Sequence, residues 1–142
     1  MNEPETIKKI FKMKTIAVVG LSPNPNRPSH GVASYLQSVG YKIIPVNPGH
    51  NEILGEKSYP TLKDISDPVE IVDVFRRPEY VDQIVDDTIK IGAKALWLQD
   101  GVVNEVAAKR AEDAGLHVVT DDCMLRKHRE FSEKGYTPFC PL

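Results

Sequence analysis

The stretch KTIAVVGLSPNPNRPSHGVASYL, from Lys14 to Leu36, decides the fold. It opens with a short apolar run rich in β-branched residues at 15–19, which is typical of a strand buried on both faces of a parallel sheet. Gly20 permits a tight turn out of this strand, the proline-rich loop after it cannot be helical, and Ser29 is a suitable N-cap for a helix. A strand, a glycine turn and a helix start together favour anion binding, because free backbone N–H groups and the helix dipole face the same point. The stretch therefore predicts a site for a nucleotide phosphate.

Apolar runs and turn residues alternate along the rest of the chain. They predict further strands at 41–46, 71–75, 95–98 and 117–120, and helices at 3–12, 29–39, 78–91 and 104–114, with short helical turns at 61–65 and 123–128 and loops at 51–59 and 135–142. Strands that alternate with helices require right-handed crossovers and helices on both sheet faces. We predict an α/β fold, a three-layer, Rossmann-like, doubly wound parallel sheet of five strands. The order that we expect, numbered along the chain, is 3-2-1-4-5.

Length and composition limit the class of protein. A chain of 142 residues with 41% hydrophobic content predicts one domain, 1–142. No apolar run approaches the roughly 20 residues of a membrane span, and the amino terminus lacks a signal-peptide core, so we expect a cytoplasmic protein without a membrane partner. Cys123 and Cys140 do not have the spacing of a zinc site or of a disulfide scaffold, and both are expected to be thiols.

Charge is distributed unevenly although the net charge is only −2. Residues 6–51 contain no Asp or Glu but six Lys and Arg, whereas the chain from Glu52 onward holds 18 acids and 12 Lys and Arg. The basic half coincides with the glycine turn, as a polyanionic ligand would require, although a chance distribution among buried strands is the alternative. Nucleic acid is disfavoured as a partner, because the loop has no aromatic residue and the chain is acidic overall.

In doubly wound sheets, ligands bind over the carboxyl ends of the strands, near the point where the strand order reverses. A nicotinamide dinucleotide would require G-x-G-x-x-G and an acid at the end of the second strand. Here Gly20 is followed by Leu-Ser-Pro, and the second strand ends in Asn47 and Pro48. The missing carboxylate fits a ribose that carries a phosphate, with Arg27, Lys42 or Arg76 as partners. The pattern therefore argues against NAD and leaves NADP or coenzyme A (CoA).

The combination VVGLSPNPNRPSHGVASYL, IIPVNP, VDVFRRP, LWLQDGV and VVTDDCM, in this order and spacing, resembles the small stand-alone CoA-binding proteins. These are similar to the CoA-binding domain at the N-terminus of the succinyl-CoA synthetase α subunit and of ADP-forming acyl-CoA synthetases. The resemblance covers about 14–131, which we take as the core of the domain, and it implies that the ADP moiety of CoA is bound. It implies contacts from the loop after the first strand, from Lys42 and from the turn after the fourth strand.

The strand-end rule and the resemblance together give one set of predicted site residues. They are Gly20, Leu21, Ser22, Pro23, Arg27, Ser29, His30, Lys42, Asn47, Pro48, Phe75, Arg76, Arg77, Gln99, Asp100, Gly101 and Cys123.

No catalytic group and no metal site can be assembled from the sequence. Asp121 and Asp122 are adjacent and point in different directions, and no third metal ligand is evident. No Ser-His-Asp or Cys-His arrangement is apparent, so any enzyme activity is left open. We expect a non-catalytic module that binds CoA or an acyl-CoA and has a binding or regulatory role. A homo-oligomer or an acyl-CoA enzyme remains open as its partner. The alternatives are an NADP-dependent oxidoreductase with an atypical glycine loop and a subunit of an ADP-forming acyl-CoA synthetase.

Overall fold

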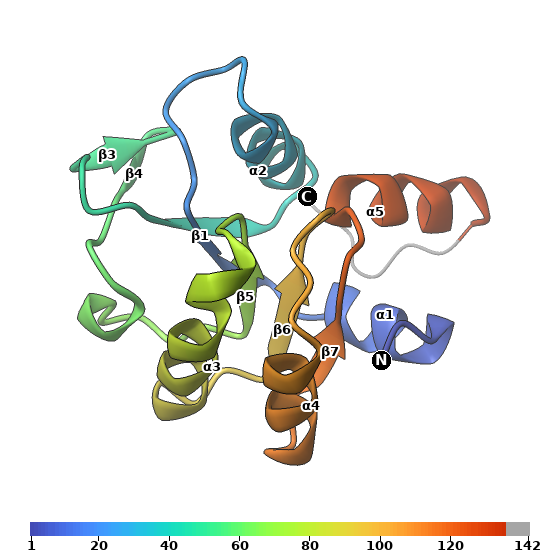
Figure 1. Ribbon diagram of the computed structural model, residues 1–142. Helices are drawn as coiled ribbons and strands as arrows, with labels where there is room; N and C mark the ends of the chain where they lie inside the picture. Colours follow the sequence, from blue (N-terminus) through green and yellow to red (C-terminus); the bar gives the residue numbers. More distant parts are fainter. Residues whose placement is uncertain (136–142) are drawn as a thin grey trace.

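Five parallel strands form the central sheet of the computed structural model, which describes residues 1–135 (Figure 1). They are β1 (Thr15–Val19), β2 (Lys42–Val46), β5 (Ile71–Val74), β6 (Ala95–Leu98) and β7 (His117–Val119). The predicted α/β fold with a five-stranded parallel sheet is confirmed, and the architecture is Rossmann-like. Cys140 and all but the first residue of the predicted 135–142 loop lie outside the described residues.

The strand order differs from the predicted 3-2-1-4-5. The sheet runs β2-β1-β5-β6-β7, which is 2-1-3-4-5 in chain order, so β2 is an edge strand and β1 lies between β2 and β5. Pro45 in β2 explains the difference. It pairs with Val18 of β1, and its carbonyl accepts from the Tyr59 N–H at 3.0 Å on the other side. Because a proline has no N–H for a second strand on that side, β2 is suited to the edge and not to the centre of the sheet.

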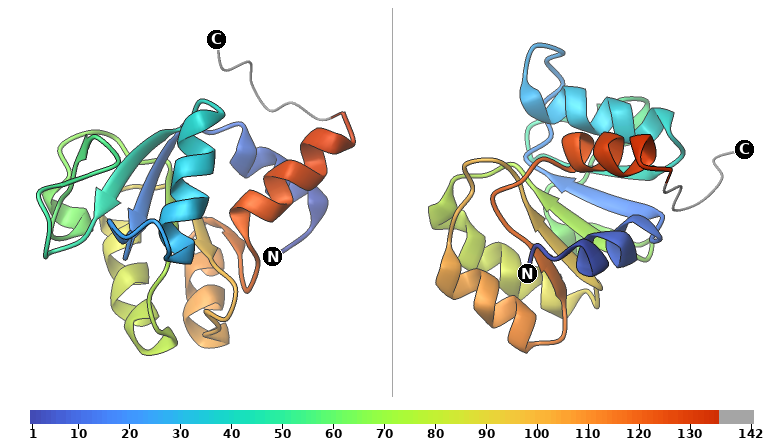
Figure 2. Two further views of the ribbon diagram at one scale, coloured as in Figure 1. Left: turned by 90° about the horizontal axis from the view of Figure 1, so that it is seen from above. Right: turned by 90° about the vertical axis from the view of Figure 1, so that its right-hand side faces the viewer.

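Helices cover both faces of the sheet and make three layers (Figures 1 and 2). On one face, α3 (Val81–Lys90) and α4 (Glu105–Asp113) pack on the even-numbered side chains of β5 and β6. On the other face, α1 (Pro4–Phe11), α2 (Pro28–Ser38) and α5 (Met124–Glu133) enclose a second core around the fully buried Trp97. Strands with buried residues on both faces carry the continuous apolar runs that the sequence shows.

Several local boundaries differ from the sequence expectations. The predicted loop at 51–59 contains a short antiparallel hairpin of β3 (Glu52–Ile53) and β4 (Glu56–Lys57). The predicted turn at 61–65 is the 3-10 helix η1 (Leu62–Asp64), and a second one, η2 (Pro78–Tyr80), precedes α3. Helix α5 continues past His128, because Phe131 extends its buried face beyond Met124 and His128.

None of the helices within residues 1–135 combines the length and the hydrophobicity that a membrane crossing needs.

Candidate functional site

A pocket of about 730 Å³ lies at the carboxyl edge of the sheet, by which we mean the edge formed by the carboxyl ends of the strands. The chain leaves β1 toward β2 on one side, and β5 pairs with β1 on the other, so this is the point where the strand order reverses. The pocket is lined by Gly20, Ser22, Arg27, Pro28, Ser29, Val32, Phe75, Arg76, Arg77, Pro78, Gln99, Asp100, Gly101, Val102 and Cys123. Its volume is within the range of small-molecule and cofactor sites.

Gly20 and Phe75 follow β1 and β5 and form the base of the pocket. The Phe75 N–H donates to the Val19 carbonyl at 2.8 Å, and the Gly20 N–H donates to the Val46 carbonyl at 2.9 Å. Gly20 has φ +86°, and a Cβ built on it would lie 2.4 Å from the Phe75 carbonyl oxygen. Only glycine fits here, because a side chain would be strained by both the backbone angle and the contact. The chain is thereby kept close to whatever occupies the pocket.

The loop between β1 and α2 is held by its own polar side chains. The Ser22 N–H donates to Ser29 Oγ at 3.0 Å, and Ser22 Oγ accepts from the Asn24 N–H at 3.1 Å. Ser29 is therefore not the N-cap that the sequence predicts: α2 begins at Pro28, Arg27 occupies the N-cap position without a side-chain cap, and Ser29 lies in the first turn. The first turn of α2 carries no acid, so the positive end of its dipole is uncompensated beside the pocket.

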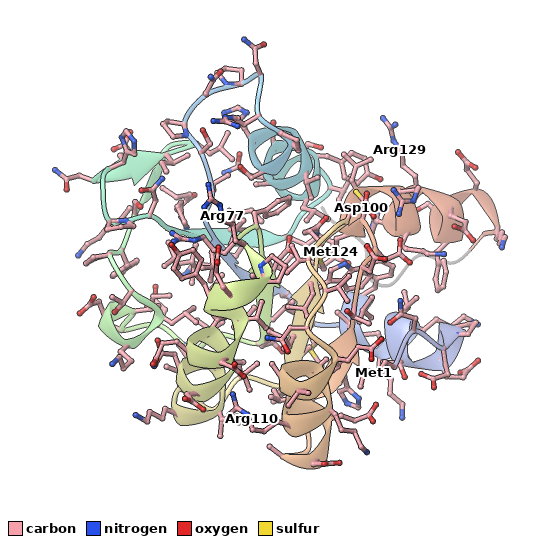
Figure 3. All side chains as sticks on the ribbon, viewed as in Figure 1. Met1, Arg77, Asp100, Arg110, Met124 and Arg129 are labelled. Carbon is pink, nitrogen blue, oxygen red and sulfur yellow. The ribbon has the colours of Figure 1, made fainter. Side chains whose placement is uncertain are left out.

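Three arginines line the pocket, and within residues 1–135 neither Arg27 nor Arg76 has a carboxylate within ion-pair distance. The Arg76 guanidinium lies over the Tyr80 ring, 4.4 Å from its centroid, which is cation–π geometry. Arg77 is 3.9 Å from Glu79 and largely exposed. Figure 3 shows Arg77 and Asp100 on the loops that leave the carboxyl ends of β5 and β6. The uncompensated guanidinium groups make this edge suitable for an anion.

Asp100 is the carboxylate among the lining residues, and its charge is neutralised by Arg126 of α5. Arg126 donates from both terminal nitrogens to the two oxygens of Asp100, at 3.0 and 2.9 Å, and from Nη2 to Asp122 Oδ1 at 2.7 Å. The hydrogen bond from Arg126 holds the pKa of the Asp100 carboxyl below its ordinary value, against the opposing effect of burial. This bidentate pair joins the turn after β6 to the start of α5 across one end of the pocket.

Gln99 lies at the floor of the pocket and is tied to a buried acid beneath it. Its Nε2 donates to Asp73 Oδ1 at 2.7 Å, and Gln99 and Asp73 are 3% and 0% exposed. Asp73 Oδ2 is buried and has no hydrogen-bond partner among the described residues. Burial raises the pKa of Asp73 to about 7, although the hydrogen bonds from Gln99 and from the Val74 N–H oppose the shift.

The structure brings most of the predicted site residues to this pocket. Those that line it are Gly20, Ser22, Arg27, Ser29, Phe75, Arg76, Arg77, Gln99, Asp100, Gly101 and Cys123. They come from the loops after β1, β5, β6 and β7, so the expectation that strand ends gather at one edge describes the geometry correctly.

Lys42 is the clearest exception among the predicted site residues. It is the first residue of β2, at the amino end of the strand, and its Nζ lies 3.2 Å from Asp67 Oδ2. Four residues of extended chain separate it from the carboxyl edge, roughly 13 Å at the usual rise of a strand. The position at which Lys42 enters the strand, and not its charge, keeps it away from the pocket.

The other predicted residues outside the lining serve the scaffold or the loop. Leu21 is fully buried in the core beneath α2. Asn47 donates from Nδ2 to the Leu21 carbonyl at 2.9 Å and accepts from the Gly49 N–H at 2.9 Å, so its side chain holds two loops together. Pro23 and Pro48 are exposed, and His30 is half-buried in the first turn of α2.

Asp73 and Arg126 are not among the residues predicted from the sequence, and neither are the lining residues Pro28, Val32, Pro78 and Val102. A signal for Asp73 was present: it is the one polar residue in the run Ile-Val-Asp-Val-Phe at 71–75. A charged residue in a strand with two buried faces is costly without a partner, so it calls for an explanation. In the part of the chain that the structure describes, no group of three His, Cys, Asp or Glu side chains has the arrangement of metal ligands.

Comparison with known proteins connects this geometry to a family. Residues 14–129 match the family described as CoA binding domain. The chain is 43% identical over 123 residues to the uncharacterized protein YneT of Bacillus subtilis, covering 86% of this chain and 91% of that protein. It superposes with a TM-score of 0.85 on the structure of a hypothetical protein from Pyrococcus horikoshii, with 43% identity and 89% of each chain covered.

A third relative is much longer. Acetate–CoA ligase [ADP-forming] II of Archaeoglobus fulgidus is 29% identical over 108 residues, which are 75% of this chain but only 16% of the ligase. The similarity thus concerns one portion of that enzyme. By the family match and by these similarities, the chain belongs to the CoA binding domain family.

Proposed function

We propose that this protein binds CoA or an acyl-CoA through its ADP moiety, in the pocket at the carboxyl edge, and acts as a binding or regulatory module. The proposal depends on two guanidinium groups, those of Arg27 and Arg76. They lack carboxylate partners among residues 1–135 and line the pocket together with the first residues of α2. The ADP moiety of CoA carries a pyrophosphate and a ribose phosphate, and such groups are bound by guanidinium groups and by helix N-termini.

The pocket is better suited to a phosphorylated ribose than to the unphosphorylated ribose diol of NAD. A diol would need a carboxylate at the end of β2. That position holds Asn47, whose side chain is occupied by the Leu21 carbonyl and the Gly49 N–H. In the described residues, the carboxylate that lines the pocket is Asp100, and both of its oxygens accept from Arg126. The ligand therefore meets mainly positive charge.

The scope of the proposal is a module and not a whole ligase. Acetate–CoA ligase II of A. fulgidus is similar to this chain over only 16% of its own length. We propose that the partner of this module is an acyl-CoA enzyme or a second copy of the module itself.

Calorimetry with CoA, dephospho-CoA, NADP and NAD tests the proposal. CoA is expected to bind more tightly than NAD or NADP, and at least about tenfold more tightly than dephospho-CoA, a difference of about 1.4 kcal/mol. The gap between CoA and dephospho-CoA should narrow as salt rises, because the ribose phosphate would meet exposed side chains. Binding of NADP without binding of CoA would overturn the proposal. Equal affinities for CoA and dephospho-CoA would restrict recognition to the pyrophosphate and adenine.

A further inference from the structure

Asp73 and Gln99 form a buried, hydrogen-bonded polar pair directly below the pocket. Asp73 lies in β5 between Val18 of β1 and Trp97 of β6, so both strand neighbours are apolar. Gln99 follows β6 and lines the pocket. One arm of the Gln99 amide, Nε2, is bound to Asp73 Oδ1, and the planar amide therefore directs Oε1 away from Asp73. Asp73 Oδ2 remains without a partner in the described chain.

The protonation state of Asp73 determines whether the N–H₂ group or the oxygen of the Gln99 amide faces the Asp73 carboxyl. An ionised carboxylate only accepts, so it requires Gln99 Nε2 and leaves Oε1 for the pocket. A protonated carboxyl can donate instead to Gln99 Oε1, and the amide then turns its N–H₂ group to the pocket. The turned arrangement is favoured once Asp73 is protonated, because a proton left on Oδ2 would be a buried donor without an acceptor.

We propose that Asp73 and Gln99 form a proton-linked switch in the floor of the pocket: a protonated Asp73 turns the Gln99 amide so that it donates to an acceptor oxygen of the ligand, and ligand binding takes up this proton. The inference rests on the proposed function and identifies Asp73 as a positioning residue that acts through Gln99. Two effects act in the same direction. Protonation presents a donor to a phosphate or carbonyl oxygen, and it removes a buried negative charge from below an anionic ligand.

Burial raises the pKa of Asp73 to about 7, so the switch operates near neutral pH. Charged or titratable side chains come from the pocket lining and from the helices α2 and α5. They are Arg27, His30, Tyr35, Arg76, Arg77, Asp100, Cys123, Arg126, Lys127, His128, Arg129, Glu130 and Glu133. None of them is hydrogen bonded to or paired with Asp73. Its titration is therefore governed by burial and, in the opposite direction, by the hydrogen bonds from Gln99 and the Val74 N–H, and an anion in the pocket should raise its pKa further.

The pH dependence of CoA binding, measured by calorimetry on the wild type and on Asp73→Asn, tests the switch. An Asn side chain can donate to Gln99 Oε1 and so imitates the protonated acid. From about pH 6 to about pH 8, wild-type affinity should fall about fivefold relative to Asp73→Asn, as expected if the ligand raises the Asp73 pKa from about 7 by about one unit. The comparison with Asp73→Asn cancels the titration of CoA itself. Asp67→Asn is the control. Asp67 is an exposed acid paired with Lys42 at the other end of the sheet, and its replacement should leave the pH dependence of CoA binding as in the wild type.

The outcomes separate this inference from the proposed function. CoA binding with parallel pH profiles for the wild type and Asp73→Asn overturns the switch and leaves CoA binding intact. Absence of CoA binding by the wild type at every pH overturns both. A second measurement needs no variant: ¹³C NMR of the Asp73 carboxyl in the wild type should show its titration midpoint rising on addition of CoA. An unchanged midpoint overturns the switch even if Asp73→Asn does not fold.

Discussion

Gly20 and Phe75 leave adjacent parallel strands so closely that a Cβ on Gly20 would lie 2.4 Å from the Phe75 carbonyl oxygen. This approach brings the loop after β1 and the loop after β5 together at the base of the pocket. The ladder fixes the distance, because Val19 and Val74 are paired and the Phe75 N–H donates to the Val19 carbonyl. The backbone at the site is therefore determined by the pairing of β1 with β5.

Gly20→Ala should destabilise the protein by about 2 kcal/mol or more, because it combines a positive φ with a clash against backbone. Gly31→Ala is the matched control. Gly31 lies inside α2, and a Cβ there would meet nothing within 4 Å, so this change should stabilise by roughly 0.5–1 kcal/mol. Urea unfolding of both variants measures the difference. Equal stabilities for the two variants would contradict the role that we assign to Gly20.

Arg27→Ala should weaken CoA binding by about 1.5 to 3 kcal/mol, the usual size of a charge-assisted hydrogen bond. The melting temperature of the free protein should change little, because Arg27 is exposed and has no ion pair within residues 1–135. Arg129→Ala is the control: Arg129 lies over the Tyr35 ring, is not among the residues that line the pocket, and points away from the labelled Arg77 and Asp100 (Figure 3). Calorimetry on both variants decides the point. An unchanged affinity in Arg27→Ala would make it a surface residue.

Asp73 should make stability depend on pH in the direction opposite to that of most acids. Its folded-state pKa is raised to about 7, so between about pH 4 and pH 7 the folded protein retains a proton that the unfolded chain has lost. The contribution of Asp73 to the free energy of unfolding is therefore largest below about pH 4. It decreases as the pH rises and is lost at about pH 7. Relative to Asp73→Asn, the wild type should lose on the order of a few kcal/mol across this interval. Denaturant unfolding across this pH interval measures the change, and parallel stability curves for the two proteins would count against a buried protonated acid.

Local sequence patterns predict the fold, but the strand order depends on one residue, Pro45, and on its missing N–H. Short apolar runs bounded by turn or loop residues marked every strand of the central sheet. The order depended on Pro45, whose missing N–H is tolerated at an edge and not between two strands. This signal was present in the sequence, whereas the pairing of the β3–β4 hairpin depends on tertiary contacts with little local pattern.

The site was predictable where it depends on strand ends and not where it depends on packing. Loops after parallel strands meet at one edge, so the positions of Gly20, Arg76 and Gln99 in the sequence alone predict that they lie at this edge, where they line the pocket. Lys42 was misplaced because its charge was considered without its place at the start of β2. Arg126 lies on α5, and its contact with Asp100 depends on how this helix packs against the turn after β6, which no local pattern predicts.

Arg126→Ala should weaken CoA binding about fivefold at low salt. The change leaves the Asp100 carboxylate without its partner at the pocket wall, where it repels an anionic ligand. The loss should diminish at higher salt, because the groups are about half exposed. Lys134→Ala removes an exposed partner of Glu130 on the same helix and should leave CoA affinity unchanged. Calorimetry at two salt concentrations measures both variants. If affinity in Arg126→Ala matched the wild type, Asp100 would lie too far from the bound ligand to affect it.

Alkylation of Cys123 should report occupancy of the pocket without any substitution. Cys123 lines the pocket, is half-buried, and is fixed by the hydrogen bond from its N–H to Asp122 Oδ1 at 2.8 Å. A ligand seated against this wall blocks the thiol, so the rate of reaction with iodoacetamide should fall about tenfold when CoA is present at about ten times its dissociation constant. Peptide mapping by mass spectrometry separates Cys123 from Cys140, and NAD at the same concentration should give little protection. If Cys123 reacted at the same rate with saturating CoA as without it, the ligand would bind elsewhere or leave this wall of the pocket open.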